Sequence, residues 1–147
     1  MIQKIVVGTD GSDTAAQAVV QAGELAEKLG AQLVIVSAFE PVSESRLKTE
    51  QAGAPEDVAW TINKREDVDA MLGQISAPLA ERDIDVKVAA RQGNPADAIL
   101  DIAEEEHADL IVVGNKGMAG ARRFLLGSVP NKISHHAPCS VLIVRTT

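Results

Sequence analysis

Five short aliphatic runs, separated by segments with helical periodicity, constrain the fold of this chain more than any other feature of its sequence. Each run is long enough for a buried strand and is followed by a turn or by the start of a helix. Aromatic residues make up only 2% of the chain, so the core is built from aliphatic side chains. Aliphatic strands of this kind are typical of parallel sheets covered by helices on both faces. The runs are Ile5–Val7, Leu33–Ser37, Val86–Ala90, Leu110–Val113 and Val141–Val144.

Four segments between these runs have the apolar spacing of amphipathic helices. The first extends from Thr14 to Leu29, and we expect it to end at Gly30 because glycine readily adopts the left-handed conformation that closes a helix. Asn94 and Pro95 supply a capping residue and a proline at the first position of a later helix. The remaining two helices are expected over Val68–Leu79, with a kink near Pro78, and over Ser128–His136.

This alternation of strands and helices predicts a single α/β domain with right-handed crossovers and a parallel sheet. A chain of 147 residues has the usual size of one domain. The polar segment Phe39–Asn63 interrupts the pattern and contains Pro41, Gly53 and Pro55. We interpret it as a flap with one short helical piece, because loops of this length in compact domains are often functional lids.

Charge and cysteine content narrow the classes of partner and compartment. The net charge of −7 argues against nonspecific binding to nucleic acids or anionic membranes, so any anion site must be local. No apolar stretch approaches the about 18 residues that indicate a transmembrane helix. The single cysteine, Cys139, excludes an internal disulfide and fits a reducing compartment. With no signal peptide recognised, we expect a cytoplasmic protein that binds neither nucleic acid nor membrane.

The segment between the fourth strand and the last helix carries the strongest functional signal. Its glycines let a ligand approach the backbone closely, and a helix start offers free N–H groups that favour phosphate. Lys116 and Arg122 add local positive charge to an acidic protein. The spacing is Gly-x2-Gly-x9-Gly-Ser, which is neither a dinucleotide fingerprint nor a Walker A loop. By itself, a glycine-rich loop is equally consistent with a structural turn.

Several separated segments resemble the universal stress protein family, and the resemblance covers nearly the whole chain. Ile5–Ser12 is similar to the family's first strand and acidic turn, Ala108–Gly114 also matches, and His136–Arg145 is similar to its last strand. The family's pattern G-x2-G-x9-G-(S/T) is met by Gly114, Gly117, Gly127 and Ser128.

The resemblance implies one universal stress protein domain over residues 1–147. Its fold is Rossmann-like, of the adenine nucleotide alpha hydrolase type, with five parallel strands in the order 3-2-1-4-5. Family members that keep the glycine motif bind ATP or related adenine nucleotides, and members commonly dimerise through the last strand, here Val141–Val144. The sequence does not rank ATP, ADP, AMP and cyclic AMP.

In that strand order, ligands bind beyond the carboxyl ends of strands 1 and 4, whose crossovers leave in opposite directions. By resemblance, the adenine lies near Thr9 and the end of the second strand, the glycine loop holds the phosphates, and Asp10 contacts the ribose or a phosphate-bound Mg²⁺. The nucleotide-binding residues implied in this way are Gly8, Thr9, Asp10, Ser37, Ala38, Val113, Gly114, Asn115, Lys116, Gly117, Arg122, Gly127, Ser128, Val129 and Pro130, with Asp10 also as the metal ligand.

Two of these residues have a purely structural alternative. Asp10 could cap the first helix, and Ser128 could be only the N-cap of the last helix. We do not expect Ser128 to be a nucleophile, because no Gly-x-Ser-x-Gly surrounds it. No catalytic residue is identified by the sequence.

Three functions are open on these grounds. The first is a nucleotide-binding sensor or regulator of the stress response. The second is a slow Mg-dependent ATPase or phosphotransfer enzyme, for which the sequence offers no clear base or arginine finger. The third is a nucleotide-free dimer that works as an interaction module.

Overall fold

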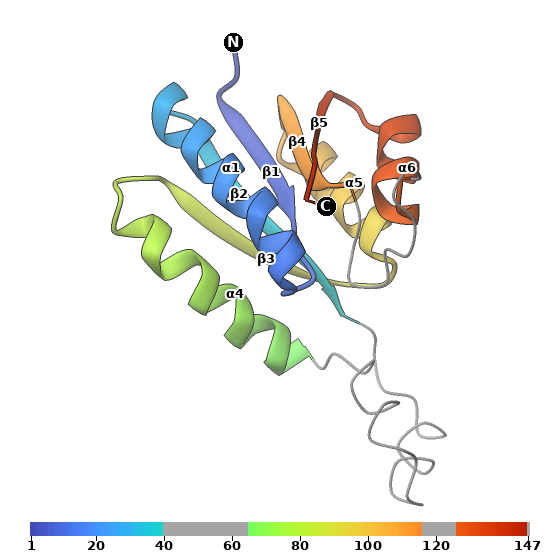
Figure 1. The fold of residues 1–147 in the computed structure, drawn as a ribbon, viewed down its shortest axis with the longest axis horizontal. Coiled ribbons are helices and arrows are strands. Elements are labelled where there is room, and N and C mark those ends of the chain that lie inside the picture. Colours follow the sequence, from blue (N-terminus) through green and yellow to red (C-terminus); the bar gives the residue numbers. More distant parts are fainter. Residues whose placement is uncertain (40–64, 116–125, 147) are drawn as a thin grey trace, which may run out of the picture.

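A five-stranded parallel sheet forms the centre of the protein (Figure 1). The structure is a computed structural model that describes residues 1–39, 65–115 and 126–146. The strand order is β3-β2-β1-β4-β5, so the predicted fold class and strand order are both confirmed. The strands are β1 (Lys4–Gly8), β2 (Gln32–Phe39), β3 (Val86–Gln92), β4 (Leu110–Gly114) and β5 (Ser140–Val144).

Helices cover both faces of the sheet (Figure 1). On one face lie α1 (Asp13–Leu29) and α4 (Arg65–Ala80), and on the other lie α5 (Pro95–Glu105) and α6 (Ser128–His136). In the described ranges, no helix combines the length and the apolar character needed to cross a membrane.

The core is divided into two layers by the alternation of side chains along the strands. Ile5 and Val7 of β1 pack under α1 and α4, whereas Val6 between them packs under α5 and α6. All three side chains are fully buried. Burying a side chain of this size stabilises the fold by about 1.5–3 kcal/mol, so the central strands anchor both layers.

The predicted helix boundaries are confirmed where capping residues define them. Ser12 caps α1 by accepting from the N–H of Ala15 at 3.2 Å, and Gly30 closes this helix with a φ of 65°. Asn94 caps α5, where its Oδ1 accepts from the N–H of Ala96 at 2.9 Å. The structural alternative in which Asp10 caps α1 is wrong, because Ser12 is the N-cap residue of this helix.

Two boundaries differ from the sequence expectation because strand pairing extends past the aliphatic runs. β2 and β3 pair as far as Phe39 and Gln92. Phe39 therefore belongs to β2 and not to the predicted flap, whose other residues, 40–63, lie outside the described part of the chain. Pro78, where a kink is expected from the sequence, lies inside α4 and close to its last residue, Ala80.

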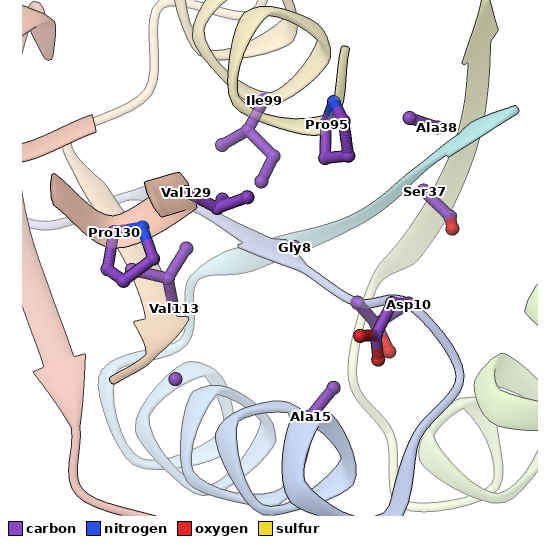
Figure 2. Close-up of a pocket in the computed structure, with 12 residues that line it drawn as sticks. Gly8, Asp10, Ala15, Ser37, Ala38, Pro95, Ile99, Val113, Val129 and Pro130 are labelled. Atoms are coloured by element: carbon purple, nitrogen blue, oxygen red, sulfur yellow. The ribbon is translucent and has the colours of Figure 1, made fainter. Parts of the chain in front are cut away.

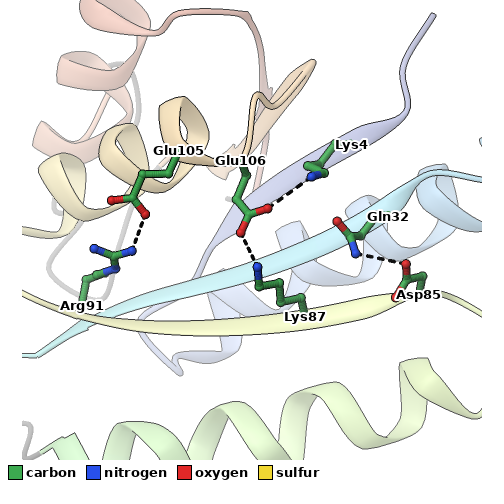
Figure 3. Close-up of polar contacts among 7 residues, drawn as sticks. All are labelled: Lys4, Gln32, Asp85, Lys87, Arg91, Glu105 and Glu106. Carbon is green, nitrogen blue, oxygen red and sulfur yellow. Dashed lines mark hydrogen bonds and ion pairs between the residues drawn. The ribbon is translucent and has the colours of Figure 1, made fainter.

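The amino end of the sheet is held by polar contacts between distant segments (Figure 3). Glu106 accepts from the ammonium groups of both Lys87 and Lys4, and these bonds lower the pKa of its carboxyl. Asp109 accepts from the N–H groups of Gln3 (2.8 Å) and Lys4 (3.1 Å), which lowers its pKa as well. These carboxylates join β1 and β3 to the segment between α5 and β4.

Candidate functional site

A pocket opens at the carboxyl end of the sheet, where β1 and β4 are neighbours (Figure 2). After β1 the chain passes to α1 on one face, and after β4 it passes to α6 on the other. Such a point of divergence is where doubly wound sheets bind ligands. The lining residues are Gly8, Thr9, Asp10, Ala15, Ser37, Ala38, Pro95, Ile99, Val113, Gly114, Val129 and Pro130.

The pocket is mainly apolar, with a few polar groups that come together from two strands. Thr9 and Ser37 are the buried polar residues of the described chain, with exposed fractions of 9% and 4%. The third polar residue, Asp10, is exposed. An apolar cavity with a small number of placed polar groups is the usual composition of a site for a small organic ligand.

Hydrogen bonds in the turn after β1 fix the position of Asp10. The Oδ1 atom of Asp10 accepts from the N–H of Ser12 at 2.9 Å, and Thr9 Oγ1 accepts from the N–H of Gly11 at 3.1 Å. Gly11 has a φ of 82°, a backbone conformation that residues other than glycine rarely adopt. The turn therefore presents a carboxylate at the pocket in a defined place.

Close packing between β1 and α5 forms one wall of the pocket. A Cβ atom on Gly8 would lie 2.3 Å from Cδ1 of Ile99, so glycine is needed for α5 to approach the strand. Ile99 lies one helical turn after Pro95, and both residues line the pocket (Figure 2). Ile99 is 3% exposed, so this wall is well packed.

Three lining residues were missed by the sequence analysis: Ala15, Pro95 and Ile99. A signal for two of them was present, because the strand order places the helix start at Asn94 and Pro95 on the same edge of the sheet as the glycine loop. Ala15 is one turn into the helix that follows Asp10. The sequence pattern by itself indicates only helix starts and inner helix faces at these positions.

The structure brings together nine of the residues implied as nucleotide-binding. Of the others, Asn115, Gly127 and Ser128 are described but flank the pocket without lining it. Lys116, Gly117 and Arg122 lie outside the described residues. The nine that line it are Gly8, Thr9, Asp10, Ser37, Ala38, Val113, Gly114, Val129 and Pro130.

The start of α6 differs from the structural alternative considered for Ser128. Gly127 is the N-cap residue of α6, and no side chain among the described residues makes a capping hydrogen bond to the helix. Ser128 is the first helical residue and is exposed. The interpretation of Ser128 as the N-cap is therefore wrong.

The polar groups at the pocket do not form a multidentate metal site. Across the described ranges, no group of three or more His, Cys, Asp or Glu side chains is placed to hold a metal ion. Asp10 is the one carboxylate among the described lining residues. A single carboxylate fits an ion that takes its other ligands from a bound phosphate and from water, as Mg²⁺ often does.

Fold and pocket together define a doubly wound α/β protein with a small-ligand site at its switch point. The model of the universal stress protein family matches residues 1–145. The chain therefore belongs to the universal stress protein family.

Individual relatives cover almost the full length of the chain. A universal stress protein of Mycobacterium tuberculosis strain H37Rv is 36% identical over 155 residues, which span 97% of this chain and 96% of that protein. The universal stress protein YxiE of Bacillus subtilis strain 168 is 35% identical over 149 residues, with 99% and 100% covered. A universal stress protein solved in complex with cAMP has a TM-score of 0.73 and 32% identity, with 99% and 98% covered.

Proposed function

We propose that this protein binds an adenine nucleotide in the pocket between β1 and β4 and acts as a regulator through the bound state. The observation that carries the proposal is the gathering, around one pocket at the switch point, of nine residues that the family resemblance implies as nucleotide-binding. The relative solved with cAMP supports the same class of ligand. No catalytic step is part of the proposal.

The lining residues suggest how the parts of a nucleotide are divided over the pocket. Apolar walls and the buried Thr9 and Ser37 suit a purine, which has a flat apolar ring and polar edges. Asp10, which lines the pocket, is proposed to accept from ribose hydroxyls. Phosphates are assigned to Gly114, Lys116, Gly117 and Arg122 and to the N–H groups of Ser128 and Val129 at the start of α6. Asn115 and Gly127, which bond to each other, flank this region, and Pro130, which has no N–H, lines the pocket wall.

The start of α6 favours an anion for a physical reason. The first N–H groups of a helix have no partner within the helix, and the helix dipole places partial positive charge there. A phosphate can accept from these groups without a large positive patch. This matters because the chain has a net charge of −7. Where ATP is the ligand, Asp10 would be the residue that holds Mg²⁺, and the ion would offset the negative charge of the phosphates.

Titration calorimetry with cyclic AMP, AMP, ADP and ATP, with and without Mg²⁺, tests the proposal. We expect saturable binding of at least one of them, and we expect nucleotide in the supernatant when gently purified protein is denatured. Guanosine triphosphate is the control for base recognition. If no adenine nucleotide is released and none gives a heat of binding, the proposal is wrong.

We also propose that two copies associate along β5, which is an edge strand. Val141, Leu142 and Ile143 are all half-buried there, and an edge strand offers its outward-facing backbone groups for pairing with another strand. The opposite edge strand, β3, also exposes the apolar Val88, but exposed Lys87 and Arg91 lie on the same strand.

Light scattering of Leu142→Lys tests this association, with Val88→Lys on β3 as the matched control. We expect the wild type and the control to be dimers and Leu142→Lys to be a monomer. A monomeric wild type at micromolar concentration contradicts the proposed dimer. Action in the cytoplasm is proposed on the sequence alone, from the single Cys139.

A further inference from the structure

Asn115 connects three parts of the chain that are far apart in the sequence. Its N–H donates to the carbonyl of Val144 at the end of β5, and its own carbonyl accepts from the N–H of Gly127, both at 2.9 Å. Its Oδ1 atom accepts from the N–H and the hydroxyl of Thr146, at 2.8 and 2.9 Å. One residue therefore joins both flanks of segment 116–125 to the residues that follow β5.

These hydrogen bonds lie beside the pocket without being part of its lining. Gly114, which precedes Asn115, lines the pocket, and so do Val129 and Pro130, which follow Gly127 closely. The bond from Gly127 to Asn115 therefore fixes the separation of the two walls that these residues form. Asn115 and Thr146 are each half-buried, so water competes only in part for their hydrogen bonds.

We propose that Asn115 is a positioning residue through which the segment after β5 and the occupied pocket stabilise each other. The inference rests on the proposed nucleotide binding. A ligand that orders the pocket walls favours the arrangement in which Asn115 accepts from Thr146. By thermodynamic linkage, the bonds from Thr146 then raise the affinity for the ligand by the same factor.

The same link gives the edge strand a way to influence the pocket. Val144 ends β5, and Thr146 lies two residues beyond it. A second copy packed along β5 would order these residues and act on nucleotide affinity through Asn115. Dimerisation and nucleotide binding are thus expected to favour each other.

A graded series of substitutions at Thr146 tests the link without touching the pocket. Serine keeps both donors, valine keeps only the N–H, and proline keeps neither. In calorimetric titrations with cyclic AMP and with ATP, we expect unchanged affinity for Thr146→Ser, about twofold weaker binding for Thr146→Val and about five- to tenfold weaker binding for Thr146→Pro. Thermal unfolding of each variant shows whether the fold is retained.

Amide hydrogen exchange adds a measurement that would not depend on nucleotide if Asn115 only stabilised the fold. In the wild type, bound cyclic AMP or ATP should slow exchange of the Thr146 N–H, and Asn115→Ala should abolish this slowing. Without nucleotide, the Gly127 N–H should exchange faster in Thr146→Pro than in Thr146→Ser.

The outcomes separate this inference from the proposed function. Equal exchange of the Gly127 N–H in the two Thr146 variants overturns the link, whatever the protein binds. Equal nucleotide affinity across the series overturns the coupling and leaves the proposed function standing. If the exchange rates differ as expected but the wild type binds neither cyclic AMP nor ATP, the proposed function fails and the positioning by Asn115 is supported.

Discussion

The two ends of the sheet differ in what their polar side chains contact. At the amino end, Glu106 accepts from Lys4 and Lys87 (Figure 3), and Asp109 accepts from the N–H groups of Gln3 and Lys4. At the carboxyl end, Asp10, Thr9 and Ser37 line an open pocket that is otherwise apolar (Figure 2). The carboxylates at the amino end join segments that are far apart in the sequence, whereas the Asp10 carboxylate accepts a local hydrogen bond from the Ser12 N–H and lines the pocket.

This difference teaches where stability and binding are located in the molecule. Strands and helices meet at both ends, but only at the carboxyl end do the crossovers leave in opposite directions and open a space. Changes at the amino end should therefore alter the free energy of unfolding and leave nucleotide affinity unchanged. Changes at the carboxyl end should alter nucleotide affinity and leave the free energy of unfolding unchanged, except where a residue of the pocket wall is also part of the hydrophobic core.

The largest effect is expected at Gly8, where pocket and core coincide. Gly8→Val places its Cβ against Cδ1 of Ile99, forces the side chain into the pocket and should weaken nucleotide binding by about 100-fold. The matched rescue is Gly8→Ala combined with Ile99→Val, which removes Cδ1 and should recover most of the loss seen with Gly8→Ala alone. A Gly8→Ala protein that binds as tightly as its rescued form would contradict this account of the wall.

A smaller loss is expected at Asp10, on the exposed side of the pocket. Asp10→Asn keeps an oxygen that can accept from the Ser12 N–H but removes the charge, so the turn should persist. Hydrogen bonds to a charged group contribute about 1.5–3 kcal/mol, so affinity should fall by about tenfold or more with little change in unfolding. Calorimetry and thermal unfolding measure both quantities, and equal affinity would remove Asp10 from the site.

The amino end should control stability in acid. Because the folded pKa values of Asp109 and Glu106 are lowered, their contribution is present above the unfolded pKa values of about 4 and is lost as pH falls through the folded values. Asp109→Asn should therefore weaken the dependence of the urea midpoint on pH between about pH 5 and 2. Its nucleotide affinity at pH 7 should equal that of the wild type.

If the urea midpoint of Asp109→Asn depends on pH as strongly as that of the wild type, the prediction is wrong. The hydrogen bonds from Gln3 and Lys4 would then stabilise the fold independently of the charge of Asp109. Asp101→Asn, on the exposed surface of α5, is the matched control. It should leave both the urea midpoint and its pH dependence unaltered.

The smallest effect is expected at His107, which follows α5 at the amino end. His107 has a φ of 54°, in the left-handed region that costs residues other than glycine about 1–2 kcal/mol. His107→Gly relieves this strain and should raise the melting temperature by a few degrees. The greater flexibility of glycine in the unfolded chain offsets part of this gain. Nucleotide affinity should not change, and a lower melting temperature would contradict the prediction.

Much of the carboxyl end could be predicted because it is encoded in local patterns. Two halves of one site can be predicted in this way. One is the glycine spacing at Gly114, Gly127 and Ser128, and the other is the turn at Thr9 and Asp10. The roles of capping residues were less predictable. Asp10 and Ser128 both have the composition of caps, but the structure uses Ser12 and Gly127 instead. Capping depends on the backbone conformation of one residue, which composition does not specify.

The sequence by itself determined the alternation of elements, the parallel sheet and the family, because aliphatic periodicity and glycine spacing are short-range properties of the chain. Only the tertiary structure decided that Pro95 and Ile99 complete the pocket wall and that Asn115 accepts from Thr146. These contacts join segments on different crossovers. Their geometry depends on how the helices pack across the sheet, for which no local pattern carries a signal.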